Sequence, residues 1–156
     1  MRTTFLLSLF CLCFLATIFA NDQELIQLEK KALSEQNPTL HNKVALLYLD
    51  QKAWSKAKKN ANKALMLAKA SANTAITAQA NEILGVVAKE RFDYTNATEF
   101  LLTGLDGWKK EKNAAGIART NLHIGQIFYF EKDYVNALIH LNRAKEGFEK
   151  LEATEK

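Results

Sequence analysis

A block of sequence that recurs at a constant spacing constrains the fold of this chain more than any other feature. It runs from Leu84 to Leu105 and aligns, without a gap, with positions 44–65 and with positions 124–145. The spacing is about 40 residues, and a fixed period between about 20 and 50 residues indicates an array of stacked structural repeats. The matching positions are Val44-Ala45, Tyr48, Lys52-Ala53-Trp54, Ala57, Ala61 and Ala64-Leu65 in the first copy, Leu84-Gly85, Ala88, Phe92-Asp93-Tyr94, Ala97, Leu101 and Gly104-Leu105 in the second, and Ile124-Gly125, Phe128, Lys132-Asp133-Tyr134, Ala137, Leu141 and Ala144 in the third.

The small residues of the repeat predict two helices that pack closely against each other. Helix axes usually lie about 8–10 Å apart, and the shorter distances require small contact residues. Trp54, Tyr94 and Tyr134 would begin the second helix of each pair and fill the space between neighbouring pairs. The small residues are Ala45, Gly85 and Gly125 on the first helix and Ala57, Ala97 and Ala137 on the second.

The same positions resemble the tetratricopeptide repeat (TPR), a helix–turn–helix unit of about 34 residues. Four features depart from that family: its early Trp and its terminal Pro are absent, Ala88 stands where the aromatic residue is expected, and the period of this chain is longer. We interpret the longer period as helices about one to two turns longer than usual. The resemblance covers residues 38–151 and implies an all-α fold, an α-solenoid of three helix pairs. The residues that match are Leu84-Gly85 and Ile124-Gly125 for the Leu-Gly, Tyr48 and Phe128 for the aromatic residue, Ala57, Ala97 and Ala137 for the central alanine, and Ala64, Gly104 and Ala144 for the second small residue.

The N-terminus has the three parts of a secretory signal peptide. A basic start at Arg2 precedes an almost wholly apolar run over residues 5–19, and Ala20 offers a small residue before the polar Asn21. A charged start, an apolar run of about 7–15 residues and a small-residue cleavage site define such a leader. We therefore expect a signal peptide at residues 1–20 and an exported protein, periplasmic or secreted. The alternative is an uncleaved anchor, which normally needs about 20 apolar residues to span a bilayer.

The remaining residues, 21–156, are expected to form one TPR-like helical repeat domain. They hold no cysteine, because Cys11 and Cys13 both lie in the leader, so the domain depends on its apolar core. Residues 21–36 read as an N-terminal capping helix with an apolar face at helical spacing. The repeats cover about 38–72, 78–112 and 118–152, with first helices near 38–50, 74–90 and 114–130 and second helices near 54–70, 94–111 and 134–151.

Asparagines mark the expected helix boundaries. Asn37 stands before Pro38, the only proline, and Pro is well tolerated at the first position of a helix. Asn73 and Asn113 are expected to separate the pairs, since Asn tolerates left-handed backbone and caps helices well.

No arrangement of residues in the chain predicts catalysis. A metal site needs convergent ligands, and no two of His41, His123 and His140 are four residues apart. A glycine-rich phosphate loop and a G-x-S-x-G motif are both absent from the sequence. We therefore expect a protein that is not an enzyme and that needs neither a cofactor nor a metal.

The net charge of +4 is distributed unevenly along the chain. We interpret a cluster of lysines in the second helix of the first pair as a solvated convex face, and the alternative is a basic patch for an anionic partner or lipid headgroups. Nucleic acid is not an expected partner, because the leader would export the protein. The lysines are Lys52, Lys56, Lys58, Lys59, Lys63 and Lys69, of which Lys56, Lys59 and Lys63 share one face.

The resemblance implies a peptide-binding groove lined by the first helices. A carboxylate clamp of the kind some family members have is not supported, because Leu46 stands where the clamp needs a polar residue. The surface instead suits a protein segment with apolar anchors. The inward-facing residues are expected to be Thr39, Asn42, Leu46 and Leu49 in the first pair, Gln79, Glu82, Val86 and Lys89 in the second, and Arg119, Leu122, Gln126 and Tyr129 in the third.

The sequence of the last expected helix predicts a second contact surface. Repeat arrays need a cap with a polar outer face at each end, and the helix at 134–151 still carries apolar residues. We expect self-association or partner docking there, or a parent protein that continues the array, and the alternative is a frayed, partly exposed last helix. The apolar residues are Leu138, Leu141, Phe148 and Leu151.

Two function classes follow from these features. The first is a non-catalytic protein–protein interaction scaffold of the exported compartment, which binds a peptide or protein segment in its concave groove. The second is an extracytoplasmic sensory segment of, or related to, a larger membrane signalling protein of the histidine kinase or diguanylate cyclase type, which the long repeats resemble.

Overall fold

The structure, a computed structural model, describes residues 23–154, and every regular element in that range is an α-helix. A helix over residues 23–35 comes first. The predicted leader, residues 1–20, and its cleavage point before Asn21 lie outside the described residues. The helices that follow are α2 (Pro38–Asp50), α3 (Trp54–Ala70), α4 (Thr74–Glu90), α5 (Tyr94–Lys110), α6 (Ala114–Phe130) and α7 (Tyr134–Thr154).

The predicted helix bounds agree with these within three residues. The largest difference is at α7, which continues to Thr154 instead of ending at 151. The second and third helix pairs begin at Thr74 and Ala114, before the predicted repeat starts at 78 and 118.

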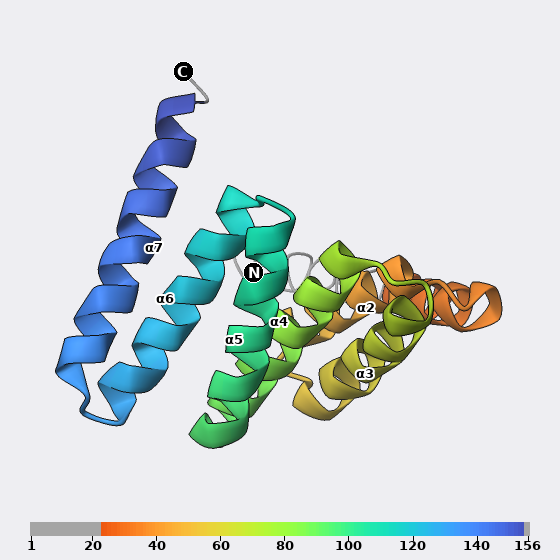
Figure 1. The fold of residues 1–156 in the computed structure, drawn as a ribbon. Helices are drawn as coiled ribbons and strands as arrows, with labels where there is room; N and C mark the ends of the chain where they lie inside the picture. Colours follow the sequence, from red (N-terminus) through yellow and green to blue (C-terminus); the bar gives the residue numbers. More distant parts are fainter. Residues whose placement is uncertain (1–22, 155–156) are drawn as a thin grey trace, which may run out of the picture.

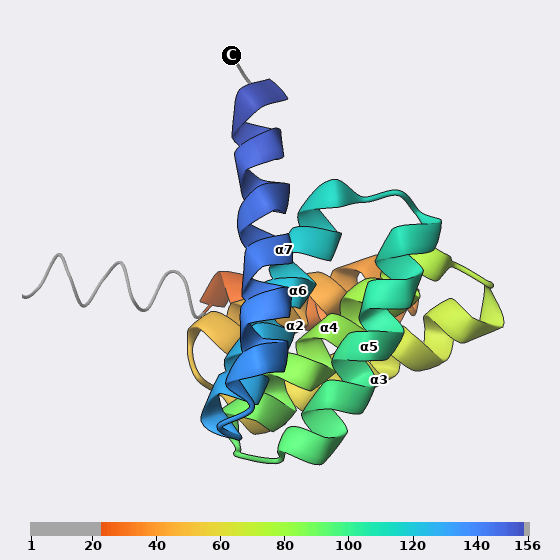
Figure 2. The ribbon, with the colours of Figure 1, turned by 60° about the vertical axis from the view of Figure 1, so that its left-hand side comes forward.

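The helices lie side by side in chain order, from the helix over 23–35 at one end to α7 at the other (Figure 1, Figure 2). α2 contacts α4, and α4 contacts α6, whereas no such contact joins α3 to α5 or α5 to α7 within residues 23–154. The first helices therefore form an inner layer and the second helices an outer one. Among the described helices, none is both long and apolar enough to cross a membrane.

Asparagine side chains cap three of the helices, as the sequence predicts. The Asn113 Oδ1 atom accepts the Gly116 N–H at 2.8 Å, and Asn37 and Asn73 cap α2 and α4 in the same way. The left-handed backbone does not fall on Asn73 or Asn113, whose φ angles are −86° and −83°. It falls on the residue before each, Ala72 and Lys112. An N-cap needs extended backbone, so the turn completes its reversal one residue earlier.

The glycines allow the helices of each pair to approach closely. A Cβ atom on Gly85 would lie 2.5 Å from Leu101 Cγ, and one on Gly125 would lie 2.8 Å from Leu141 Cγ. These contacts confirm the packing that the repeat predicts. The apolar core then builds up across the pairs: one cluster joins the helix over 23–35 to α2, α3 and α4, and a second joins α5 to α6.

Candidate binding groove

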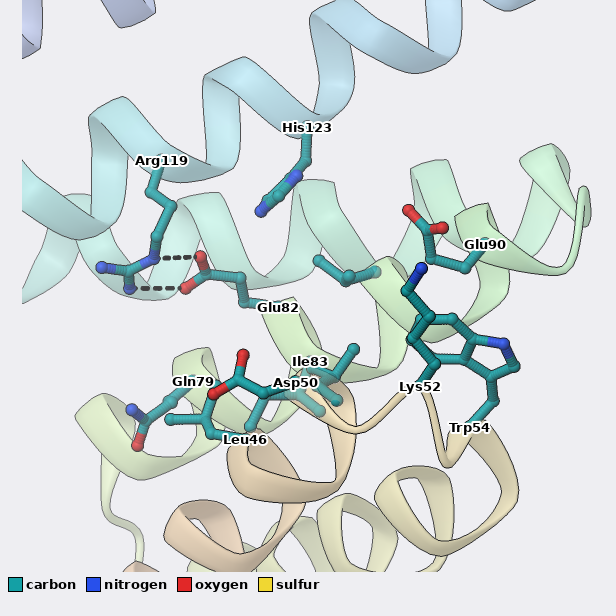
Figure 3. Close-up of a pocket in the computed structure, with 12 residues that line it drawn as sticks. Leu46, Asp50, Lys52, Trp54, Gln79, Glu82, Ile83, Glu90, Arg119 and His123 are labelled. Carbon is teal, nitrogen blue, oxygen red and sulfur yellow. Dashed lines mark hydrogen bonds and ion pairs between the residues drawn. The ribbon is translucent and has the colours of Figure 1, made fainter. Parts of the chain in front are cut away.

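The inner layer contains a hollow of about 540 Å³, which Figure 3 shows in close-up. Its walls come from α2, from the α2–α3 turn, from Trp54 at the start of α3, and from the facing sides of α4 and α6. Pockets of this size with mostly apolar walls and a few polar groups are the usual form of a binding site. The residues that line it are Leu46, Leu49, Asp50, Lys52, Trp54, Gln79, Glu82, Ile83, Val86, Glu90, Arg119 and His123.

The floor of the hollow is apolar. Leu46 is 40% exposed, and Leu49, Trp54 and Val86 are half-buried beside it. Burial of apolar surface contributes roughly 25 cal/mol per Å², so an apolar side chain placed here would gain free energy from these walls. Charged groups of both signs stand at the rim, including Asp50 at the end of α2 and Lys52 in the turn that follows (Figure 3).

Glu82 is part of the wall, but its carboxylate is already engaged within the protein. Arg119 donates to it from Nε at 2.6 Å and from Nη2 at 2.9 Å, and the Trp108 indole N–H donates at 2.9 Å. These bonds join α4, α5 and α6, and Figure 3 shows the paired side chains of Glu82 and Arg119 on one side of the hollow. The hydrogen bonds and the Glu82 charge raise the pKa of Arg119 above its usual value, although burial opposes this. Glu82 therefore fixes the shape of the groove and is not a free ligand-binding acid.

His123 forms an uncharged part of the wall at neutral pH. Burial lowers the pKa of its imidazole, and the nearby Lys89 and Arg119 lower it further, against the effect of Glu82. Lys89 in turn donates to Gln126 Oε1 at 2.7 Å and contacts Glu90 at 3.2 Å. The charges beside His123 are therefore held in place by neighbours from α4 and α6.

Six of the twelve predicted groove residues line the hollow. They are Leu46, Leu49, Gln79, Glu82, Val86 and Arg119.

The other six predicted residues are placed elsewhere. Asn42 is a correction: it is fully buried, and its amide donates to Ile76 O and Gln79 Oε1, because α4 packs over it. Thr39 is exposed at the start of α2. Lys89 and Gln126 bind each other, Leu122 is half-buried, and Tyr129 lies at the α6–α7 edge with its ring 5.9 Å from that of Tyr134.

Six lining residues were not predicted. The predicted register of the first helices misses Asp50, the last residue of α2. It also cannot include Lys52 and Trp54, which belong to the α2–α3 turn and the start of α3. The sequence holds a signal for them, since the turn after a first helix lies beside the next first helix in any stacked array. Ile83, Glu90 and His123 each lie one position after a predicted groove residue.

The lysines of α3 form an exposed basic surface on the outer layer. α3 has no acidic residue, and Lys56, Lys58, Lys59 and Lys69 are exposed while Lys63 is half-buried. Lys56 also lies over the Tyr48 ring, 5.1 Å from its centroid, so it contacts protein as well as solvent.

The predicted interface on α7 is only partly exposed. Leu138 is exposed, whereas Leu141, Phe148 and Leu151 are half-buried, because the inner side of α7 packs on α6. Leu141, for example, sits against Gly125.

Within residues 23–154, no three His, Cys, Asp or Glu side chains gather as metal ligands. The groove has no cysteine or serine nucleophile among its lining residues.

Comparisons with known proteins identify the type of fold. No family model and no curated protein matches the sequence. Solved structures do match. The apo form of RapI is 25% identical with a TM-score of 0.69, over 80% of this chain and 47% of that one. The TPR domain of Arabidopsis FLU is 20% identical with a TM-score of 0.64, over 76% of this chain and 98% of that one. BtubC (BKLC) from P. vanneervenii is 17% identical with a TM-score of 0.64, over 74% of this chain and 48% of that one.

The chain thus spans about half the length of RapI and BtubC and nearly all of the FLU domain. The likeness to these structures shows the fold, the stacked helix pairs described above. The chain is a TPR-like all-α solenoid.

Proposed function

We propose that the protein is a non-catalytic interaction scaffold of the exported compartment that binds a segment of a partner protein in the groove. The apolar floor of Leu46, Leu49, Trp54 and Val86 carries this proposal, because exposed apolar walls in a concave site favour an apolar anchor. The rim charges of both signs favour an anchor flanked by charged residues rather than a purely apolar segment.

A peptide library displayed on phage tests the groove directly. The purified protein should select peptides with an apolar anchor, and Leu46→Glu should remove the selection, because it places a charge on the apolar floor. Leu102→Glu on α5 is the matched control, since Leu102 has a similar exposure, 45% against 40%, and lies outside the groove. Circular dichroism should show the same helix content for both variants.

Two results would contradict peptide binding in the groove. The first is selection that persists in Leu46→Glu at the level of the control. The second is selection lost when Lys56, Lys59 and Lys63 are changed to Glu but kept in Leu46→Glu, which would assign binding to the basic surface of α3.

Export is part of the proposal and rests on the leader pattern at residues 1–20. The intact mass of the protein recovered from outside the cytoplasm should correspond to a chain that begins at Asn21. A recovered chain that retains residues 1–20 would show the uncleaved anchor instead.

The sensory alternative would use the same groove within a longer signalling protein. A reading frame that continues past Lys156 into a membrane span and a kinase or cyclase domain would support it.

A further inference from the structure

A second hollow, of about 370 Å³, lies where the helix over 23–35 meets α3. It shares no lining residue with the groove, so the two sites are separate. Ligand pockets usually measure about 300–1,000 Å³, and a hollow at the lower end of that range admits a small molecule or a single chain. We call this hollow the α3 notch, and the lining residues on which its chemistry depends are Glu29, Leu33, Lys59, Asn60, Lys63 and Met66.

Two apolar side chains of the α3 notch are open to solvent. Leu33 on the helix over 23–35 is 49% exposed, and Met66 on α3 is 55% exposed. The repeat does not require an apolar residue at the Met66 position, because the equivalent residues of the other pairs are the exposed Asp106 and Glu146. A flexible methionine side chain adapts to the shape of an apolar ligand. Met66 therefore offers the notch an apolar contact that the fold itself does not use.

Lys59 and Lys63 add two positive charges to the same hollow. Within residues 23–154, neither ammonium group forms an ion pair, and α3 has no acidic residue. The repeat does not require these charges either, since Glu99 and Ile139 hold the position of Lys59 in the other pairs. Two lysines that lack an acidic partner beside an apolar wall favour a ligand that is both anionic and apolar.

The hydrogen-bond acceptors of the wall are already engaged within the protein. The Glu29 carboxylate accepts from Tyr48 Oη at 2.6 Å and from Asn60 Nδ2 at 3.0 Å, and Asn60 Oδ1 is bonded to His41 Nδ1 at 3.0 Å. The charged donors that remain are the two ammonium groups, which bind acceptors. A peptide would bring backbone N–H groups that need acceptors, whereas an alkyl chain brings none. The two lysines and Glu29 together leave one positive charge, which a single carboxylate balances.

We propose that the α3 notch binds one alkyl carboxylate, a molecule of the fatty-acid class. The alkyl chain lies against Leu33 and Met66, which it removes from water. The carboxylate accepts charge-assisted hydrogen bonds from Lys59 and Lys63. This binding goes beyond the proposed peptide binding, because it uses a different hollow and a different class of ligand.

Titration calorimetry of the purified protein with decanoate, below the concentration at which decanoate forms micelles, tests the proposal. We expect saturable binding at one site, with amide NMR shifts that change in the helix over 23–35 and in α3. Three probes separate the parts of the ligand: acetate keeps the carboxylate without the chain, decyl maltoside keeps the chain without the charge, and decyltrimethylammonium reverses the charge. Each should bind about tenfold more weakly or less, and equal affinity of any of them would overturn the proposed chemistry.

Paired lysine variants test the site of the carboxylate. The double change Lys59→Gln and Lys63→Gln should weaken decanoate binding about tenfold or more, because it removes both charged donors. The matched control is Lys58→Gln with Lys69→Gln, which removes two exposed lysines of the same helix from outside the notch. The control should keep the affinity, and equal losses in the two double variants would overturn the site.

Met66→Asp tests the site of the alkyl chain. It restores the residue of the second helix pair, so the fold should tolerate it, and it should abolish decanoate binding because it places a negative charge on the apolar wall. Leu102→Asp on α5 is the control, at a similar exposure of 45%. Circular dichroism should show the same helix content for both variants, and decanoate binding that survives Met66→Asp would overturn the notch.

Three further results would assign the notch or the ligand differently. Phosphatidylglycerol vesicles that sediment the protein, when decanoate does not bind, would indicate a membrane surface. An acetylated and amidated Glu-Leu-Glu peptide that binds more tightly than decanoate would indicate an acidic protein segment. Loss of decanoate binding in Leu46→Glu would place the ligand in the groove. Each of these would overturn the proposal, and decanoate binding that persists in Leu46→Glu keeps it independent of the phage selection.

Discussion

At the scale of single residues, buried polar side chains tie the helices together in pairs. His41 Nδ1 donates to Asn60 Oδ1 at 3.0 Å, and His140 Nδ1 donates to Asn121 Oδ1 at 2.9 Å. The two pairs occupy equivalent positions in the first and third repeats, with histidine and asparagine exchanged between the helices. His41 and His140 are therefore packing residues, and the exchange keeps one donor and one acceptor at each site.

Glu82→Gln should lower the free energy of unfolding by about 2 kcal/mol, because the change removes the charge from three hydrogen bonds at a buried carboxylate. The midpoint of urea unfolding measures this. Glu99→Gln on the exposed side of α5 is the control and should change stability by less than about 0.5 kcal/mol. Equal effects of the two changes would show that the Glu82–Arg119–Trp108 bonds do not hold the groove.

His123 should make stability depend on pH below neutrality. Because its folded pKa is lowered, the unfolded chain binds a proton first as the pH falls below about 6.5. The free energy of unfolding should therefore decrease from about pH 7 to about pH 5. His123→Gln should reduce that slope, and the rest should come from His140, whose pKa is lowered by burial and by Arg143 and Lys109. An unchanged slope in His123→Gln would contradict the assignment.

At the scale of the helix, close approach within each pair depends on small residues at fixed positions. Gly85 and Gly125 meet leucines of the facing helix at distances that leave no room for a methyl group. The turns between helices have a second shared feature, a non-glycine residue with positive φ, for example Phe92 at 62°. Such backbone costs about 1 kcal/mol or more outside glycine, so the packing of the helices on either side must offset it.

Gly125→Ala should destabilise the protein by about 1–3 kcal/mol, although alanine by itself favours a helix by about 1 kcal/mol over glycine. The reason is that the new Cβ would lie 2.8 Å from Leu141 Cγ and 3.1 Å from the Leu141 backbone nitrogen, and backbone cannot move aside easily. Thermal or urea unfolding measures the change. Thr95→Ala, at an exposed position of α5, is the matched control and should be neutral or slightly stabilising. A stabilised Gly125→Ala protein would show that the α6–α7 pair is looser than described.

At the scale of the whole molecule, each helix pair contacts only its neighbours, so stability is a sum of local terms. The N-terminal end is closed by the helix over 23–35, whose Glu29 accepts from Tyr48 Oη at 2.6 Å and from Asn60 Nδ2 at 3.0 Å. Partial burial alone would raise the pKa of Glu29, but these two hydrogen bonds, with Lys59 and Lys56 nearby, lower it overall.

Glu29→Ala should loosen one end of the array only. Amide hydrogen exchange should become faster in residues 23–35, α2 and α3, because the helix over 23–35 loses its polar anchor to both of them. Exchange in α6 and α7 should stay the same. Faster exchange through the whole chain would mean that the array unfolds as one cooperative unit.

The sequence by itself determined the class of fold, the number of helix pairs and the helix bounds to within three residues. The reason is local: the constant repeat period, the asparagine caps and the small residues at the pair contacts act within one repeat or between neighbours, so they are readable from spacing. The tertiary structure decided which side chains of the inner layer remain available. Asn42 and Glu82 share the predicted groove register with Leu46 and Val86, yet the first two are buried and hydrogen-bonded to other helices. The tertiary structure also placed Lys52 and Trp54 in the groove and left Val135 and Ile139 exposed outside it. The exposure of a side chain depends on how neighbouring helices pack, and the position of a residue within one helix does not determine that packing.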